Sequence, residues 1–329
     1  MTMNLDSKIY IAGHKGMVGS AILRNLQAKG YTNLVIKSHH ELDLTRQAEV
    51  EQFFTQEKPE YVFIGAAKVG GIMANATYPA DFIYQNLAMQ TNILHAAYLT
   101  KVKRLLFLGS VCIYPKHCPQ PIKEEHLLTG PLEPTNAPYA IAKISGVTMC
   151  EAYNRQYGTQ FLCGMPTNLY GTGDNFDLQT SHVLPALIRK FHESKLDNTS
   201  VTLWGTGQAR REFLHVDDCA SASHFIMNLD MDKYELLLNN PSGPLVNIGC
   251  GEDMSIQELA EFVQNIVGAS GEINWDTSKP DGTPKRKLDI RQLQALGWEP
   301  LISLSEGIHK TYDWYLQDDK SVQLTESIS

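Results

Sequence analysis

The sequence predicts a doubly wound α/β fold, in which helices cover both faces of a parallel sheet, followed by a smaller mixed α/β lobe. Two observations predict it. In the first half of the chain, short apolar runs alternate with segments of helical periodicity, which is typical of parallel βαβ units. Beyond about Asn168 the elements become shorter and less regular, and Gly, Asn and Asp cluster at 171–175.

The expected elements follow one another in a regular order. Strands are expected at 8–12, 34–36, 61–64, 105–108 and 161–163, and helices at 17–29, 47–56, 79–98 and 139–157. In the second half, Ser255 and Glu258 form a capping box at the start of an amphipathic helix that runs to Val267. We assign 1–170 to the sheet domain, with some later segments returning to it, 171–320 mainly to the second lobe, and 321–329 to a frayed polar tail.

Composition excludes several classes of protein. The 329 residues carry a formal charge of −8, so no basic face for nucleic acid is expected. Hydrophobic residues make up 43% and charged residues 19%, which indicates a globular chain. The six cysteines form no C-x-x-C pair, and no leader or membrane span is visible, so we expect a cytoplasmic protein with no membrane partner and no metal site.

A glycine-rich loop at 13–19 joins the first expected strand to the first helix. In such a loop the first glycine permits a tight turn, the second lets the backbone approach a pyrophosphate, and the third lets the helix pack closely on the strand. An anion would lie at the helix N-terminus. The alternative is a tight βα turn without a ligand, but the context favours a Rossmann-type dinucleotide site. Its expected residues are Gly13, His14, Lys15, Gly16, Met17, Val18 and Gly19.

The end of the second expected strand bears on which dinucleotide binds. An acidic residue there commonly binds the ribose 2′-hydroxyl of NAD, but this segment runs Lys37, Ser38, His39. Lys15 and Lys37 are suited to neutralising a 2′-phosphate, unless both are merely solvated. We therefore expect NADP(H) rather than NAD(H), with Asp43 at the adenine edge.

Tyr139 and Lys143 lie four residues apart, on one face of an expected helix. A neighbouring ammonium group lowers the pKa of a tyrosine, which suits the phenol to proton exchange with a carbonyl oxygen. Ser110, at the end of the fourth expected strand, would donate a hydrogen bond to the same oxygen. With the glycine loop, these residues resemble the extended, nucleotide-sugar-modifying short-chain dehydrogenases/reductases.

Further segments resemble the GDP-L-fucose synthases, and they extend over nearly the whole chain. They lie at 66–72, 79–86, 132–136, 165–171, 211–218 and 279–284. The resemblance implies a bifunctional NADPH-dependent enzyme, in which GDP-4-keto-6-deoxy-D-mannose is epimerised at C3 and C5 and then reduced at C4. It also implies a homodimer formed through the helices 79–98 and 139–157.

The resemblance implies roles for individual residues. Cys112 and His182 match the base and acid of the epimerisation, although a cysteine that fills the core and a histidine at the surface are the simpler interpretations. Catalytic roles fall to Ser110, Cys112, Tyr139, Lys143 and His182. Further cofactor contacts are implied for Leu108, Gly109, Ser110, Tyr139, Lys143, Pro166, Thr167, Asn168, Leu169 and His182, and substrate contacts for Asn168, Lys190, Trp204, Arg211 and Asp281.

Two departures and four alternatives accompany this interpretation. In the glycine loop and after the second strand, where the family often carries arginines, this chain has Lys15, Lys37 and His39. Lys190 likewise replaces what is often an arginine. A 4,6-dehydratase would need an Asp-Glu pair after Ser110, and a 4-epimerase that retains NAD would favour an acid after the second strand. A non-enzymatic NADP-binding regulator typically lacks the tyrosine or the lysine. Acyl transfer through Cys112 lacks an evident oxyanion loop.

Overall fold

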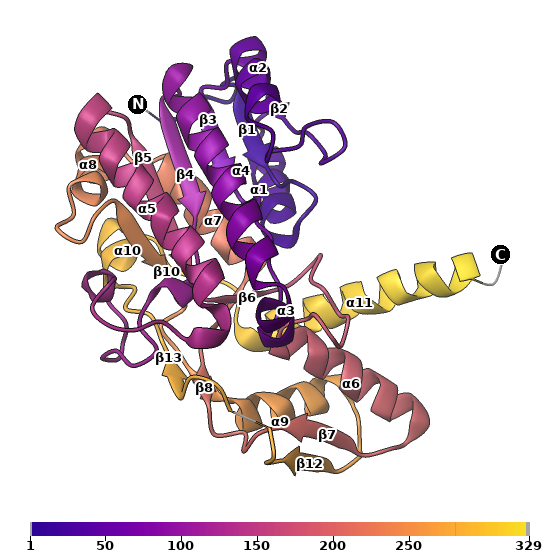
Figure 1. Ribbon diagram of the computed structural model, residues 1–329. Helices are drawn as coiled ribbons and strands as arrows, with labels where there is room; N and C mark the ends of the chain where they lie inside the picture. Colours follow the sequence, from indigo (N-terminus) through magenta and orange to yellow (C-terminus); the bar gives the residue numbers. More distant parts are fainter. Residues whose placement is uncertain (1, 280, 327–329) are drawn as a thin grey trace.

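The computed structural model describes residues 2–279 and 281–326. Its centre is a six-stranded parallel sheet in the order β10-β5-β4-β3-β1-β2 (Figure 1). Every residue of these strands except those of β2 is buried, which explains the continuous apolar runs. The strands are β1 (Ile9–Ala12), β2 (Leu34–Val35), β3 (Tyr61–Ile64), β4 (Arg104–Leu108), β5 (Phe161–Pro166) and β10 (Leu245–Ile248).

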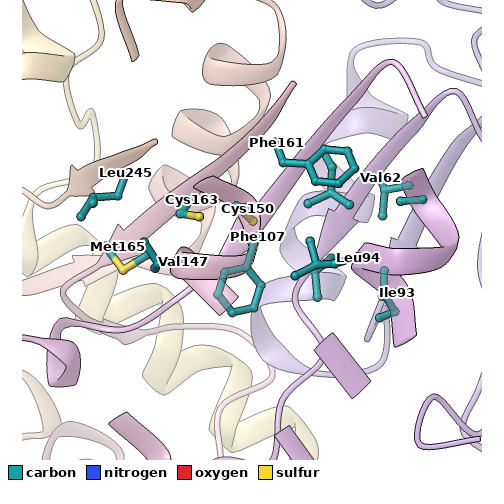
Figure 2. Close-up of a cluster of buried hydrophobic side chains, with 14 of the residues drawn as sticks. Val62, Ile93, Leu94, Phe107, Val147, Cys150, Phe161, Cys163, Met165 and Leu245 are labelled. Atoms are coloured by element: carbon teal, nitrogen blue, oxygen red, sulfur yellow. The ribbon is translucent and has the colours of Figure 1, made fainter. Parts of the chain in front are cut away.

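Helices cover both faces of this sheet. One face packs on α2 (Gln47–Glu57), α4 (Pro79–Leu99) and α5 (Ala137–Tyr157). Figure 2 shows this core, where Leu94 and Val147 from the helices meet Phe107 and Cys163 from the strands. The other face packs on four helices, α1 (Met17–Ala28), α7 (Val216–Met227), α8 (Met231–Leu238) and α10 (Arg291–Leu296).

The order of the sheet places the glycine loop at a reversal of chain direction. From β1 the chain passes through α1 to β2 on one side, and then through α2 to β3 on the other side. The loop after β1 therefore lies where the strand order reverses, the position at which ligands bind in open α/β sheets.

The second lobe has its own apolar core, built mainly from α6 (Val183–Asp197), α9 (Ile256–Val267) and α11 (Leu304–Glu326). In Figure 1 this lobe lies beyond the carboxyl ends of the large sheet. Three small strand groups complete it. They are β6 (Asn168–Tyr170) with β9 (Phe213–His215), β7 (Val201–Trp204) with β12 (Ile273–Asp276), and β8 (Arg210–Arg211) between β11 (Met254–Ser255) and β13 (Lys285–Arg286).

Most expected elements are present, with shifted ends. The capping box is confirmed, since the amide of Glu258 donates to Ser255 Oγ at 3.0 Å. The strand expected at 161–163 continues to Pro166, and the short helix α3 (Ile72–Thr77) was not expected. The frayed tail expected at 321–329 is helical as far as Glu326, because α11 is anchored by buried Ile308 and Tyr312; 327–329 lie outside the described residues.

No helix in the described part of the chain has both the length and the apolar character needed to cross a membrane.

Candidate active site

The glycine loop is shaped for a ligand at the start of α1. Gly13 has φ +84°, and a Cβ there would lie 2.7 Å from the backbone of Ala66 after β3. A Cβ on Gly19 would lie 2.1 Å from the carbonyl oxygen of Gly13. Gly16, at the N-cap of α1, meets no such obstruction, since its nearest neighbour is 3.5 Å away. Two glycines are therefore required by packing, while the backbone at Gly16 remains open to an anion.

His14 supplies an unused polar group beside this loop. Its Nδ1 is buried and has no hydrogen-bond partner. Burial, and then the charge of Lys15, lower the pKa of the imidazole, which is thus neutral at pH 7. An orphaned polar atom at this position, together with the open backbone of Gly16, fits a dinucleotide.

The turn after β2 contains an acidic residue that sequence reasoning missed. Glu41 Oε2 accepts hydrogen bonds from the amide and hydroxyl of Ser38 at 2.8 and 2.6 Å, and Glu41 Oε1 lies 4.0 Å from Lys37 Nζ. The bonds from Ser38 lower the pKa of this carboxyl, so it is charged. The structure thus brings an acid beside Lys37, whereas the sequence suggested none. The carboxylate of Asp43 accepts a hydrogen bond from the hydroxyl of Thr45 at 2.7 Å. His39 Nδ1 lies 4.0 Å from Asp43 Oδ1.

Tyr139 and Lys143 lie on one face of α5, next to the end of β4. Lys143 is 2% exposed, and its Nζ donates to the carbonyl of Leu108 at 2.9 Å. The same Nζ lies 5.9 Å from the centre of the Tyr139 ring. Tyr139 forms a hydrogen bond with the hydroxyl of Ser110, which is also the N-cap residue of the turn Val111–Ile113. The three residues expected to act together are therefore brought together.

The ionisation of this pair differs from the expectation. Burial raises the pKa of Tyr139 above its ordinary value, and only the hydrogen bond from Ser110 opposes this. Burial also lowers the pKa of Lys143 to about 7. The expected lowering of the tyrosine pKa by the lysine is therefore wrong for this chain, because loss of water outweighs the effect of an ammonium that is itself only partly charged. Tyr139 is consequently a proton donor at neutral pH.

Cys112 follows Ser110 and has two polar neighbours on its sulfur. Asn136 Nδ2 lies 3.3 Å from Cys112 Sγ, and Arg286 Nη1 lies 3.5 Å from it. The side chain is half-buried and does not fill the core. Arg211 is a further neighbour, and its own pKa is lowered to about 10 by burial and by the charge of Arg286. Sequence reasoning missed Asn136 and Arg286.

His182 is the N-cap residue of α6 and is exposed. Surrounding protein atoms lower the pKa of its imidazole by desolvation, so the ring is largely neutral at pH 7. The preceding residues are tied to the first lobe, since the amide of Gly71 donates to the carbonyl of Thr180 at 2.9 Å. No hydrogen bond joins the His182 ring to Cys112 or Tyr139 within the described residues.

The residues expected to bind the substrate gather in the second lobe, but two of them are engaged with their neighbours. Trp204 is 56% exposed, and Lys279 Nζ lies 5.8 Å from its ring centre. Lys190 Nζ donates to the carbonyl of Thr202 at 3.0 Å. Asp281 accepts from the amide and the hydroxyl of Thr206, at 2.6 and 2.8 Å, so its carboxylate anchors this loop.

A buried carboxylate joins the two lobes behind these residues. Glu212 is fully buried, and its oxygens accept the amides of Cys250, Gly251 and Leu288, each at 2.7 Å. Its carbonyl accepts from Asn168 Nδ2 at 2.8 Å. Asn168, expected to contact both ligands, and Thr167, expected to contact the cofactor, therefore also help to hold β6 beside β9.

This geometry defines a class of protein: an α/β enzyme with a dinucleotide loop and a Ser–Tyr–Lys group at the carboxyl ends of the strands. The model of the NAD dependent epimerase/dehydratase family matches residues 9–240, and the chain belongs to this family. The match covers the glycine loop, Tyr139 and Cys112, but ends before Arg286.

Particular relatives narrow the comparison. The chain is 58% identical to GDP-L-fucose synthase 1 of Arabidopsis thaliana over 95% of this chain and 94% of that protein. A GDP-6-OMe-4-keto-L-xylo-heptose reductase from C. jejuni has a similar structure, with a TM-score of 0.91, 44% identity, and coverage of 97% and 100%. A GDP-L-fucose synthetase from Naegleria fowleri bound to NADP matches with a TM-score of 0.86 at 26% identity, covering 97% of each chain. The chain thus falls among GDP-sugar enzymes of this family.

Proposed function

We propose that this protein makes GDP-L-fucose, by epimerising GDP-4-keto-6-deoxy-D-mannose at C3 and C5 and reducing it at C4 with NADPH. The observation that carries the proposal is the position of Cys112 two residues after Ser110, beside the Tyr139 and Lys143 pair, in a chain 58% identical to a GDP-L-fucose synthase. One group of side chains can thus remove a proton from carbon and donate a hydrogen bond to the carbonyl oxygen of the same sugar.

Each residue has a defined task in this proposal. Cys112 as thiolate takes the proton from C3 or C5, and the electron pair moves to the C4 oxygen, which Ser110 and Tyr139 stabilise as an enolate. His182, in the fraction of the enzyme whose ring is protonated, returns a proton on the opposite face. NADPH, when bound, supplies the hydride for C4. Tyr139 then gives its proton to the C4 oxygen, while Lys143 and Ser110 orient the phenol.

The second lobe would hold the GDP moiety. Trp204 offers an exposed aromatic face for the base, and Arg211 and Lys190 offer positive charge for the diphosphate. Asp281 serves indirectly, by fixing the loop at Thr206 next to Trp204. We propose this indirect role in place of a direct contact.

The test follows nicotinamide absorbance with purified protein, NADPH and GDP-4-keto-6-deoxy-D-mannose in D₂O. We expect NADPH oxidation and deuterium at C3 and C5 of the product. Absence of oxidation would refute the assignment. Oxidation without deuterium would leave a reductase and remove the epimerase.

The C. jejuni reductase of a GDP-4-keto-heptose, at 44% identity, favours a second candidate, C4 reduction of a heptose. The same assay with a GDP-4-keto-heptose separates the two. Under the first proposal, kcat/KM is at least tenfold higher for the 6-deoxy sugar. A preference for the heptose would reverse the assignment.

For the cofactor, we propose NADP(H), bound with its 2′-phosphate near Lys15 and Lys37. Glu41 opposes this binding, because its charged carboxylate already lies beside Lys37. The variant Glu41→Gln should lower the KM for NADPH several-fold and leave the KM for NADH unchanged. Glu49, an acid in the first turn of α2, gives the matched control Glu49→Gln. An equal change for both dinucleotides would exclude contact with the 2′-phosphate.

We also propose a cytoplasmic homodimer formed through α4 and α5. These packed helices expose large apolar side chains, namely Tyr84, Leu99, Ile141 and Tyr157. Sedimentation should give a dimer for the unchanged chain and a monomer for Tyr84→Glu. The control Leu236→Glu, exposed on α8, should remain dimeric. A monomeric unchanged chain would refute this interface.

A further inference from the structure

The two-residue strands β8 and β13 carry two rows of positive charge. Arg210 pairs with Lys285, and Arg211 pairs with Arg286, so the two rows face opposite sides. The outer row has an acid of its own, since Asp253 lies 2.6 Å from Arg210 Nε and 3.2 Å from Lys285 Nζ. The inner row faces the sulfur of Cys112.

No carboxylate forms an ion pair with Arg286 within residues 2–279 and 281–326. Its side chain is 7% exposed, and its other hydrogen bond goes to the hydroxyl of Thr283, at 3.4 Å. Glu133 is nearby, but it pairs with Lys116 at 2.8 Å. A buried guanidinium without an ion-paired carboxylate is unfavourable unless a neighbouring group supplies negative charge. Glu133 and the Cys118 thiol also feel the charge of Arg286, but the group that accepts a hydrogen bond from the guanidinium is the Cys112 sulfur, at 3.5 Å.

The charged and titratable groups around Cys112 come from three elements. Arg286 belongs to β13, Arg211 to β8 and Tyr139 to α5. Tyr139 is protonated and uncharged at neutral pH, and Asp281 partly offsets only Arg211. Two guanidinium groups therefore lie near the sulfur.

We propose that Arg286 is a further catalytic residue, whose guanidinium holds Cys112 as the thiolate that removes the sugar proton, with Arg211 reinforcing it. The proposal rests on the proposed function of Cys112. When the thiolate takes the proton from carbon, a neutral thiol forms and the electron pair moves to the C4 oxygen. Arg286 stays protonated throughout. Its charge thus favours the base before the step and remains near the developing enolate.

Glu212 positions the inner row, which consists of Arg211 and Arg286. Its amide donates to the carbonyl of Arg286 at 3.2 Å, and its carboxylate accepts the amide of Leu288, two residues further on. The backbone directly after Arg286 is therefore held by one buried residue that follows Arg211. This explains how strands of two residues can hold two like charges side by side.

The test measures alkylation of Cys112 by iodoacetamide against pH, peptide by peptide, in the full chain without substrate. Arg286→Met should raise the pH at which alkylation of Cys112 reaches half its maximal rate by about one unit or more. Alkylation at pH 7 should then slow about tenfold. Arg286→Lys should restore most of the rate. Arg210→Met, in the outer row, is the matched control and should keep the original midpoint.

Arg211→Met should give a smaller shift in the same direction, and it keeps the test open if Arg286→Met does not fold. If alkylation of Cys112 depends on pH in both variants as it does in the unchanged chain, the proposal is overturned. The assay is independent of the reaction. Shifted alkylation without deuterium exchange at C3 and C5 would leave Arg286 as the partner of Cys112 and refute the epimerase. Deuterium exchange at C3 and C5 together with an unshifted alkylation profile would support the epimerase and refute the role of Arg286.

Discussion

The site contains two proton-handling regions, one around Tyr139 and one around Cys112, and their surroundings differ in charge. Around Tyr139 and Lys143, burial removes charge: the phenol keeps its proton and the ammonium loses part of its charge. Around Cys112, Arg286 and Arg211 supply charge, and no carboxylate of the described residues forms an ion pair with either of them. A dry, neutral environment suits a proton donor, whereas a cationic one suits an anionic base. The difference teaches that neighbouring residues alone can set apart an acid and a base within one site.

The largest expected effect tests the tyrosine region. Tyr139→Phe removes the proton donor, so the rate of NADPH oxidation should fall about 10²–10⁴-fold. Deuterium exchange at C3 and C5 should fall less, because Ser110 still donates to the enolate. Both are measured in one D₂O reaction, by absorbance and by mass spectrometry. If oxidation and exchange fell equally, the two regions would not be separable.

The next effect tests the cysteine region. Cys112→Ser replaces the thiol with a hydroxyl of much higher pKa, so exchange at C3 and C5 should fall at least about a hundredfold. NADPH oxidation should persist, with a product that has not been epimerised. Cys118→Ser, at another half-buried thiol, is the control. Unchanged exchange in Cys112→Ser would remove the cysteine from the mechanism.

A third prediction concerns the pH dependence of stability in the tyrosine region. Between pH 7 and 9, Lys143 is mostly neutral in the folded chain and charged in the unfolded chain, so the unfolded chain binds more protons. The free energy of unfolding of the unchanged chain, relative to Lys143→Met, should therefore rise with pH, by at most about 1.4 kcal/mol per unit. Below pH 7 both states are charged and the slope disappears.

Urea unfolding of both chains at several pH values measures this slope. Lys233→Met, at an exposed lysine of α8, should run parallel to the unchanged chain. If the free energy of unfolding of Lys143→Met also ran parallel to that of the unchanged chain across these pH values, burial would not neutralise Lys143.

The smallest effect separates charge from hydrogen bonding at the sulfur. Asn136 donates to Cys112 without carrying charge, and such a bond contributes about 0.5–1.5 kcal/mol. Asn136→Ala should therefore slow exchange at C3 and C5 by a factor at the lower end of about two- to twelvefold, and by less than Arg286→Met slows it in the same assay. A larger loss than in Arg286→Met would show that the amide, and not the guanidinium, sets the character of this region.

Local signals made much of the fold predictable. The strand at 61–64 and the capped helix ending at Val267 appear as expected, because apolar runs and caps act over a few residues. The glycine loop and the pair Tyr139 and Lys143 were likewise predictable, since strand–loop–helix order and helical spacing place them.

The rest depends on tertiary contacts. Arg286 reaches Cys112 across 174 residues, on a strand of two residues that has no periodicity to detect. Glu41 approaches Lys37 only because a turn folds back. The raised pKa of Tyr139 depends on how completely the folded protein buries the phenol, which the spacing between residues does not reveal.

The pairing of β10 with β5 has a consequence for synthesis of the chain. Cys163 is paired with Leu245, so the sheet is left with an open edge while the intervening 81 residues are translated. All six residues of β5 are buried once the sheet is complete. During elongation this strand is an apolar template for pairing with other nascent chains. A ribosome paused between these two strands should therefore carry an aggregation-prone chain, and one paused well beyond Ile248 should not.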